Sequence, residues 1–313
     1  MVTENYDGGD LVLGTSGLVL SPKEFPHLTG LKGRTLLTSD GTTILGADDK
    51  AGIAEILTMI ERIQTENRPH GMICVAFTPD EEIGMGAEHF NLDQFGAEYA
   101  YTLDGDSEGE IQYENFNACK AEFEIRGFNV HPGEGKDTMI NASLVAIEIN
   151  NCLPSMETPR GTEDYEGFYH LISMQGEVGE AKLNYIVRDH DKNGFEERKK
   201  TLRLIEKNLN AKWGEGTVTL KITDQYLNMK EIVEEHMHLI DHAKKACEAA
   251  GVAPLILPIR GGTDGCQLSF KGLPCPNLGT GGHAFHGPYE HISVEGMEKS
   301  VELLLALIQE YTK

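Results

Sequence analysis

The stretch MICVAFTPDEE, residues 72–82, decides the fold class. Its first six residues form a continuous apolar run, which is typical of a strand buried on both faces of a sheet. A helix is expected before it, at residues 49–64, and a second short strand after it, at residues 99–103. Because strands and helices alternate in this way, the sequence predicts an α/β fold with a mostly parallel sheet. The apolar stripe of the expected helix comprises Ile53, Ile56, Leu57, Ile60 and Ile63.

The middle of the chain has a different pattern. The expected elements are strands at 120–126 and 217–224, a strand pair within 165–189, and helices at 137–151 and 195–210. This β-α-β-β-α-β order is the ferredoxin-like pattern of an α+β domain. The α/β pattern resumes at Glu231. We therefore expect one domain built from residues 1–116 and 231–313, with a smaller domain, residues 117–230, inserted into it.

Composition excludes several classes of protein. The formal net charge of -23 argues against nucleic acid or an anionic membrane as a partner. No apolar run approaches the roughly 18 residues that span a membrane, and the first ten residues, MVTENYDGGD, do not resemble a signal peptide. The six cysteines are widely spread and form no C-x-x-C pair, so we expect reduced thiols in a cytoplasmic protein.

Three acidic clusters follow expected strands. They are G-A-D-D-K-A-G at residues 46–52, T-P-D-E-E at residues 78–82 and D-G-D at residues 104–106. In an open parallel sheet, sites gather beyond the carboxyl ends of the strands. Each cluster alone is more often a helix cap or a solvated turn. Three clusters at equivalent strand ends bring like charges together, and a metal cation is the economical way to compensate them.

The adjacent carboxylates Glu81 and Glu82 suggest a division of labour. One can bind a metal ion, and the other can take a proton from a metal-bound water. A histidine ligand can come from the Gly-rich loop at residues 281–290, which contains His283 and His286. Either histidine alone is more often a surface loop residue, so this choice rests on the neighbouring acidic clusters.

A second group of histidines is an alternative candidate for a metal site. His236, His238 and His242 lie on one expected helix, with the last two on the same face. That spacing can bind a metal ion. Because no acidic partner lies near them in the sequence, we expect an exposed helix face instead.

The motifs taken together resemble a known family. G-A-D-D-K-A-G, F-T-P-D-E-E, T-L-D-G, N-V-H-P-G, I-R-G-G-T-D-G and F-H-G-x-x-E resemble the peptidase T branch of the M20 metallopeptidases, which are tripeptide aminopeptidases. The order and spacing of the motifs match over nearly the whole chain. The resemblance implies a zinc-peptidase-like catalytic domain at residues 1–116 and 231–313, with residues 117–230 as a lid or dimerisation domain.

The resemblance also implies a site with two zinc ions per subunit. Asp48 corresponds to the carboxylate that bridges the two ions, and the peptide bond after it is expected to be cis. Glu82 and His286 correspond to ligands of one ion, and Asp104 to a ligand of the other. Glu81 corresponds to the general base.

Substrate contacts are implied on the inserted domain and near it. His131 corresponds to a histidine that reaches the active site of a partner subunit, so a homodimer is expected. Arg260, Arg188 and Asn141 correspond to groups that hold a small peptide substrate, and the fork of an arginine suits a terminal carboxylate. For Arg188 the alternative is an ion pair at a strand end with Asp189 or Asp191.

One family motif is not found. An H-x-D motif, whose histidine binds the second zinc ion, is expected before Gly46, but His27 is followed by Leu-Thr. We therefore expect an incomplete second metal position, impaired activity, and a truncated product, a misassigned start or a fragment. The alternatives are another M20 hydrolase (a dipeptidase, carboxypeptidase or amide deacylase) and a non-catalytic remnant that binds peptides.

Overall fold

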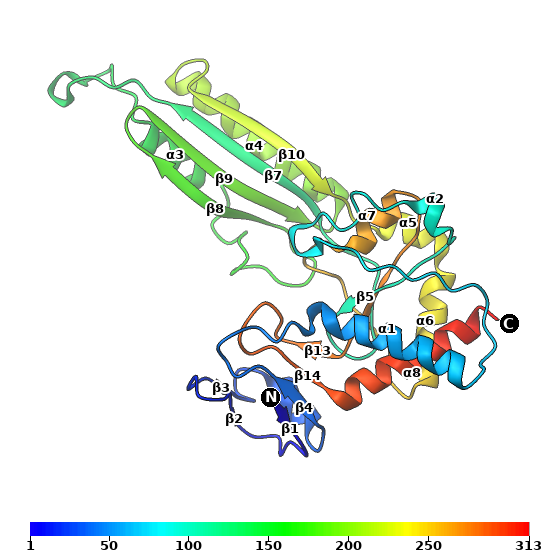
Figure 1. Ribbon diagram of the computed structural model, residues 1–313. Coiled ribbons are helices and arrows are strands. Elements are labelled where there is room, and N and C mark those ends of the chain that lie inside the picture. Colours follow the sequence, from blue (N-terminus) through cyan, green and yellow to red (C-terminus); the bar gives the residue numbers. More distant parts are fainter. Residues whose placement is uncertain (313) are drawn as a thin grey trace. The chain divides into compact units, whose positions relative to one another are not determined.

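The computed structural model describes residues 1–312 (Figure 1). The chain forms two compact units. The first contains Met1–Tyr113, Met229–Leu257 and the residues from Thr263 onward. The second contains Glu114–Asn228 and the short return segment Pro258–Gly262. No helix among residues 1–312 combines the length and the apolar character that crossing a membrane requires.

The first unit is an α/β unit with several small sheets. Its strands are β1 (Val2–Thr3), β2 (Leu11–Val12), β3 (Val19–Leu20), β4 (Leu36–Thr38), β5 (Thr102–Gly105), β6 (Glu110–Gln112), β11 (Leu255–Ile256), β12 (Asn277–Gly279), β13 (Gly282–His283) and β14 (His291–Ser293). Its helices are η1 (Pro26–Leu31), α1 (Ala47–Thr65), η2 (Glu81–Ile83), α2 (Leu92–Phe95), α5 (Lys230–Val233), η4 (Glu234–His236), α6 (His238–Ala249), α7 (Asp264–Phe270) and α8 (Val294–Glu310). These elements confirm the predicted α/β class.

Two four-stranded sheets organise this unit. In the order β11-β6-β12-β5, β11 pairs with β6 and β12 with β5 in parallel, whereas β12 and β6 are antiparallel. The order β1-β4-β14-β13 is antiparallel throughout. Helices α1 and α6 both pack against α8. Strand β5 carries the sequence-predicted ligand Asp104, and the loop between β13 and β14 carries His286.

Helix α1 confirms the predicted helix but not all of its predicted stripe. Ile53 and Leu57 are 38% and 52% exposed. The helix approaches β5 closely, because a Cβ atom on Gly52 would lie 2.2 Å from the Leu103 carbonyl oxygen. The side centred on this glycine is therefore the one that is buried. Its buried residues are Ala47, Ala51, Gly52, Glu55, Met59 and Ile63.

The predicted buried strand at residues 72–77 is wrong. The backbone of this segment is irregular, and the side chains of Met72 and Phe77 are 84% and 50% exposed. A strand buried on both faces needs a neighbouring strand and two covering layers. Within residues 1–312, no strand pairs with this segment, and β5 lies at the edge of its sheet. The apolar composition alone therefore did not determine the structure of this segment.

The second unit has the predicted ferredoxin-like pattern. Its elements are β7 (Asn117–Arg126), η3 (Pro132–Glu134), α3 (Ala142–Asn151), β8 (Phe168–Gly176), β9 (Glu180–Asp189), α4 (Lys192–Trp213) and β10 (Val218–Tyr226). The strands form one antiparallel sheet in the order β10-β7-β9-β8, and α3 and α4 pack on it (Figure 1). Strand β7 alternates buried and exposed residues, so that Phe123 and Ile125 enter the core while Lys120 and Glu124 face solvent.

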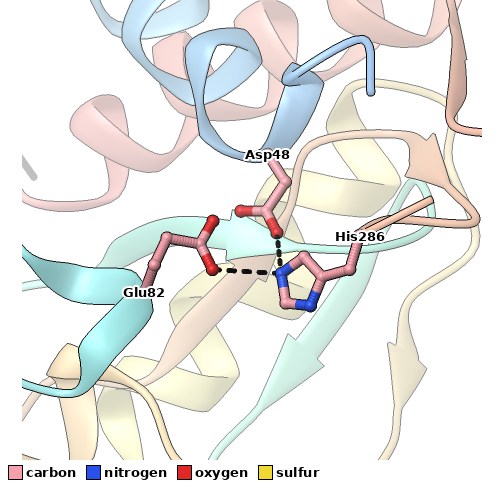
Figure 2. Close-up of side chains that lie close together, drawn as sticks. All are labelled: Asp48, Glu82 and His286. Carbon is pink, nitrogen blue, oxygen red and sulfur yellow. Dashed lines mark ion pairs between the residues drawn. The ribbon is translucent and has the colours of Figure 1, made fainter. Parts of the chain in front are cut away.

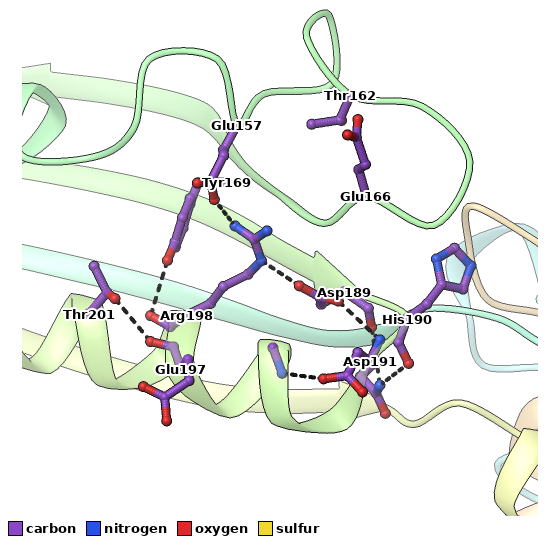
Figure 3. A network of polar contacts seen from close by, with 12 residues as sticks. Glu157, Thr162, Glu166, Tyr169, Asp189, His190, Asp191, Glu197, Arg198 and Thr201 are labelled. Carbon is purple, nitrogen blue, oxygen red and sulfur yellow. Dashed lines mark hydrogen bonds and ion pairs between the residues drawn. The ribbon is translucent and has the colours of Figure 1, made fainter.

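A polar network fastens α4 to the end of β9 (Figure 3). The Arg198 guanidinium donates to Asp189 at 2.7 Å and also pairs with Glu157. It lies over the ring of Tyr169, 5.0 Å from the centroid. Asp191 caps α4 by accepting a hydrogen bond from Gly194 N. These contacts join α4 to the end of β9, the strand that carries Arg188.

Candidate metal centre

Asp48 lies where helix α1 begins. Gly46, just before the helix, has a left-handed φ of 71°, which a glycine adopts without steric cost. Asp48 and Asp49 have non-helical dihedral angles, and the peptide bond between them is cis, as the resemblance implies. The Asp48 side chain is 15% exposed.

Two other sequence-predicted ligands meet Asp48 (Figure 2). Glu82 lies in the short helix η2, and His286 lies in the loop between β13 and β14 with a left-handed φ of 61°. His286 Nε2 is 2.9 Å from Asp48 Oδ2 and 3.2 Å from Glu82 Oε2. Three segments that are distant in the sequence thus bring two carboxylates and one imidazole together.

The donor set of this cluster fits a divalent metal ion. The ligand atoms of Asp48, Glu82 and His286 all lie within 4.8 Å of one another. Carboxylate oxygen and imidazole nitrogen are ligands that zinc accepts, and three protein ligands leave a coordination position for water or substrate. The Glu82 and His286 side chains are 59% and 69% exposed. An ion can therefore enter from solvent.

Neighbouring carboxyl groups carry raised pKa values. Burial, with the charges of Asp49, Glu81 and Asp48, raises the pKa of Asp104 to about 9. Burial is also the main cause that raises the pKa of Asp49 to about 8. For Glu81, burial and the charge of Asp264 raise the pKa to about 7. Several negative charges thus crowd one place, and a bound cation would favour their ionised forms.

Asp104, the fourth predicted ligand, is positioned by a residue that the motifs did not single out. The buried Asn277 side chain on β12 accepts hydrogen bonds from Thr102 Oγ1 at 2.8 Å and from Asp104 N at 3.2 Å. Asp104 is not part of the three-residue cluster that the described residues form. The charge of Asp48 is nevertheless one of the causes that raise the pKa of Asp104, so the two carboxylates interact.

Asp264 is another residue that the sequence analysis did not single out. It is 4% exposed, and its Oδ2 accepts a hydrogen bond of 2.6 Å from Thr78 Oγ1. Thr78 opens the T-P-D-E-E segment, so Asp264 anchors the loop that carries Glu81 and Glu82. In the sequence, Asp264 is marked only by the I-R-G-G-T-D-G motif. This motif does not predict which residue Asp264 contacts.

The second unit contains the remaining predicted residues. His131 is exposed in the segment between β7 and α3, where its Nδ1 accepts a hydrogen bond of 3.2 Å from Gly133 N. Asn141 caps α3 by accepting a hydrogen bond from Leu144 N. Both side chains thus have local partners within their own unit.

The two arginines also have partners within the second unit. Arg188 is 8% exposed and donates to the carbonyl oxygens of Cys119 and Val187, and its guanidinium lies over the Tyr226 ring. Asp189, the alternative partner weighed for Arg188, pairs with Arg198 instead. The Arg260 guanidinium donates to the backbone of the loop at residues 162–166.

His238, His242 and His283 make aromatic contacts. His238 and His242 lie 5.8 Å apart between ring centroids and contact Tyr99 and Tyr311, respectively. They form no group with the ligand spacing of a metal site among residues 1–312. His283 stacks on His27 with ring centroids 4.1 Å apart. The structure thus separates His286 from the histidines that pack on one another.

The α/β unit and its carboxylate–imidazole cluster indicate a metal-dependent hydrolase as the class of protein. The chain belongs to peptidase family M20/M25/M40, whose family model matches residues 41–310. This finding confirms the family that the motifs predicted.

Individual relatives are more specific. A Peptidase T from Clostridium perfringens (strain 13 / Type A) is 56% identical over 315 residues, covering 100% of this chain and 77% of the relative. A Peptidase T from Halothermothrix orenii is 54% identical over 312 residues, covering 99% of this chain and 76% of the relative. The crystal structure of aminopeptidase PepT from Bacillus cereus ATCC 10987 is similar with a TM-score of 0.78 and 28% identity, covering 89% of this chain and 74% of that chain.

Proposed function

We propose that this chain is a metal-dependent aminopeptidase that releases the N-terminal residue from tripeptides. The observation that carries the proposal is the meeting of Asp48, Glu82 and His286 within 4.8 Å, next to the protonatable Glu81. More than half of the residues are shared with proteins named Peptidase T over essentially the whole chain, which supports the substrate class. We propose zinc as the resident ion because carboxylates and imidazole together suit it.

The chemistry follows from the proposed roles. A bound divalent ion would polarise the scissile carbonyl and lower the pKa of a water molecule. Asp48, Glu82 and His286 would hold one ion, and Asp104 would contribute to a second position. Glu81, whose pKa is raised to about 7, can accept the proton of the attacking water near neutral pH and pass it to the leaving amine.

The substrate would be held by residues of the second unit. We propose that Arg260 binds the terminal carboxylate of the peptide, with Arg188 and Asn141 assisting. Arg260 lies over the rings of Phe116 and Phe168 and donates to carbonyl oxygens of its own unit. A carboxylate is a better acceptor for a guanidinium than a neutral carbonyl, so it can replace those contacts.

We propose further that the enzyme is a homodimer in which His131 of one subunit polarises the carbonyl in the other. The exposure of His131 supports this role. Mixing Glu81→Gln and His131→Ala chains tests it. If His131 acts across the interface, each mixed dimer contains one intact site and activity returns. Activity no higher than the sum of the two variants alone would argue against the exchange.

A substrate panel tests the reaction class. The chain is loaded with zinc or cobalt and given tripeptides, dipeptides, N-acetylated amino acids and peptides with a blocked N-terminus. The proposal expects release of the N-terminal residue from free tripeptides, with little action on the others. Preferential hydrolysis of dipeptides, C-terminal residues or acetylated amino acids would instead identify another M20 hydrolase.

A further inference from the structure

Glu290 is a buried carboxylate that connects two of the ligand-bearing segments. It is 1% exposed and lies at the end of the loop between β13 and β14, four positions after His286. Its Oε2 accepts a hydrogen bond of 2.6 Å from Gly46 N, and its Oε1 accepts one of 3.0 Å from Asp48 N. One side chain therefore joins the loop that carries His286 to the backbone of Asp48.

The position of Glu290 is itself well fixed. The next residue, His291, begins β14, which pairs with β4 and with β13. Glu290 N also donates to the Gly287 carbonyl oxygen within the loop. Sites held by rigid elements keep their geometry better than sites held by loops alone. Glu290 can therefore hold the start of α1 in place through its hydrogen bonds with Gly46 N and Asp48 N.

The chemistry of the contact requires a carboxylate. Both donors are backbone N–H groups, so each Glu290 oxygen accepts one hydrogen bond. Hydrogen bonds to an ionised acceptor are roughly twice as strong as neutral ones. A glutamine of the same shape would present an amino group to one of the two N–H donors. An aspartate is one methylene shorter and cannot span both segments from the same backbone position.

We propose that Glu290 is a positioning residue of the metal centre. It sets the separation of the Asp48 carboxylate and the His286 imidazole, which is 2.9 Å between Oδ2 and Nε2. This inference rests on the proposed metal-dependent function. In the proposed role Glu290 does not contact either ligand atom. It binds the backbone of Asp48 and is part of the loop that carries His286.

Glu295 offers a matched control in the same unit. It also accepts hydrogen bonds from a backbone amide through both oxygens, at 3.1 and 2.8 Å from Thr35 N. Thr35 precedes β4 and is not one of the proposed ligands. Glu290→Gln and Glu295→Gln thus remove the same kind of contact, but only the first contact involves a metal-ligand segment.

Cobalt(II) binding to the full chain tests the proposal by isothermal titration calorimetry. Substitutions of groups that orient metal ligands typically weaken affinity by 10- to 100-fold, so we expect Glu290→Gln to raise the Co²⁺ dissociation constant by about that factor. Glu295→Gln should leave it within about twofold. Equal constants for Glu290→Gln and the unchanged chain, or equal losses in both variants, would overturn the positioning role.

Hydrogen exchange in the metal-free chain separates this proposal from the function on which it rests. Glu290→Gln should increase exchange about tenfold in peptides that contain residues 46–52 and 284–290, because a hydrogen bond to a charged group is lost. Glu295→Gln should not change these peptides. If the unchanged chain binds no Co²⁺, the proposed function fails. If exchange at residues 46–52 is unaffected by Glu290→Gln, the positioning role fails whether or not the metal binds.

Discussion

The protonation of Asp104 links metal binding at the site to the release of a proton, which can be measured. Its pKa is raised to about 9, chiefly by burial and then by the charges of Asp49, Glu81 and Asp48. At pH 7 a carboxyl group with this pKa is mostly protonated, so ionising it costs free energy. A metal ion that recruits Asp104 must displace this proton, because carboxylates bind metals in the ionised form.

We therefore expect metal affinity to rise with pH and metal binding to release protons. Below the raised pKa of Asp104, the Co²⁺ dissociation constant should fall by about tenfold per pH unit for each displaced proton. Calorimetry at pH 7 in buffers of different ionisation enthalpy counts the released protons. Asp104→Asn should lower that count by about one, whereas the control Asp93→Asn, in the short helix α2, should not change it. An unchanged count in Asp104→Asn would refute the assignment of Asp104 to the metal centre.

Three further outcomes are expected. Burial lowers the pKa of His283 to about 3, so the native state excludes a proton that the unfolded chain binds below pH 6.5. The unfolding free energy should therefore decrease as the pH falls from 6.5 to 4.5, and His283→Asn should make this decrease smaller by about 1.4 kcal/mol per pH unit. Urea unfolding of the metal-free protein at several pH values measures the decrease. The same pH dependence in both chains would contradict a buried neutral His283. Phe123→Ala, in the core of the second unit, should lower the unfolding free energy by about 3–5 kcal/mol. Met72→Ser, at an 84% exposed position, should change it by less than about 0.5 kcal/mol. Similar losses in the two variants would show that residues 72–77 are buried. Gly52→Ala should separate α1 from β5, because its Cβ would lie 2.2 Å from Leu103 O, and Co²⁺ affinity should fall; unchanged affinity would show that the site tolerates movement of α1.

The sequence predicted the fold best where one pattern indicates both the secondary structure of a segment and the elements that pack against it. In the second unit, the alternation in β7 and the β-α-β-β-α-β order predicted the sheet that is observed. The prediction for residues 72–77 was wrong because an apolar run states only that burial is favourable. Whether the segment is buried depends on strands that pair with it, and the described residues supply none.

The candidate site shows the same limit at the level of single residues. Motifs placed Asp48, Glu82 and His286 at element ends, and the structure brings them together. Their catalytic roles stay predictions. The contacts of Asp264 with Thr78 and of Glu290 with Gly46 join residues that lie far apart in the chain. No local periodicity encodes such a pair, so only the folded structure could identify them.

The most direct test of the central claim compares two chains in one assay. The unchanged chain and Glu81→Gln are loaded with Co²⁺ to equal occupancy, and release of the N-terminal residue from a tripeptide is followed at pH 7.5 and its rate compared. General base catalysis contributes about 10²- to 10⁴-fold, so the account predicts metal-dependent release that falls by at least about 100-fold in Glu81→Gln. Equal rates in the two chains, or release that persists after the metal is removed by a chelator, would contradict it.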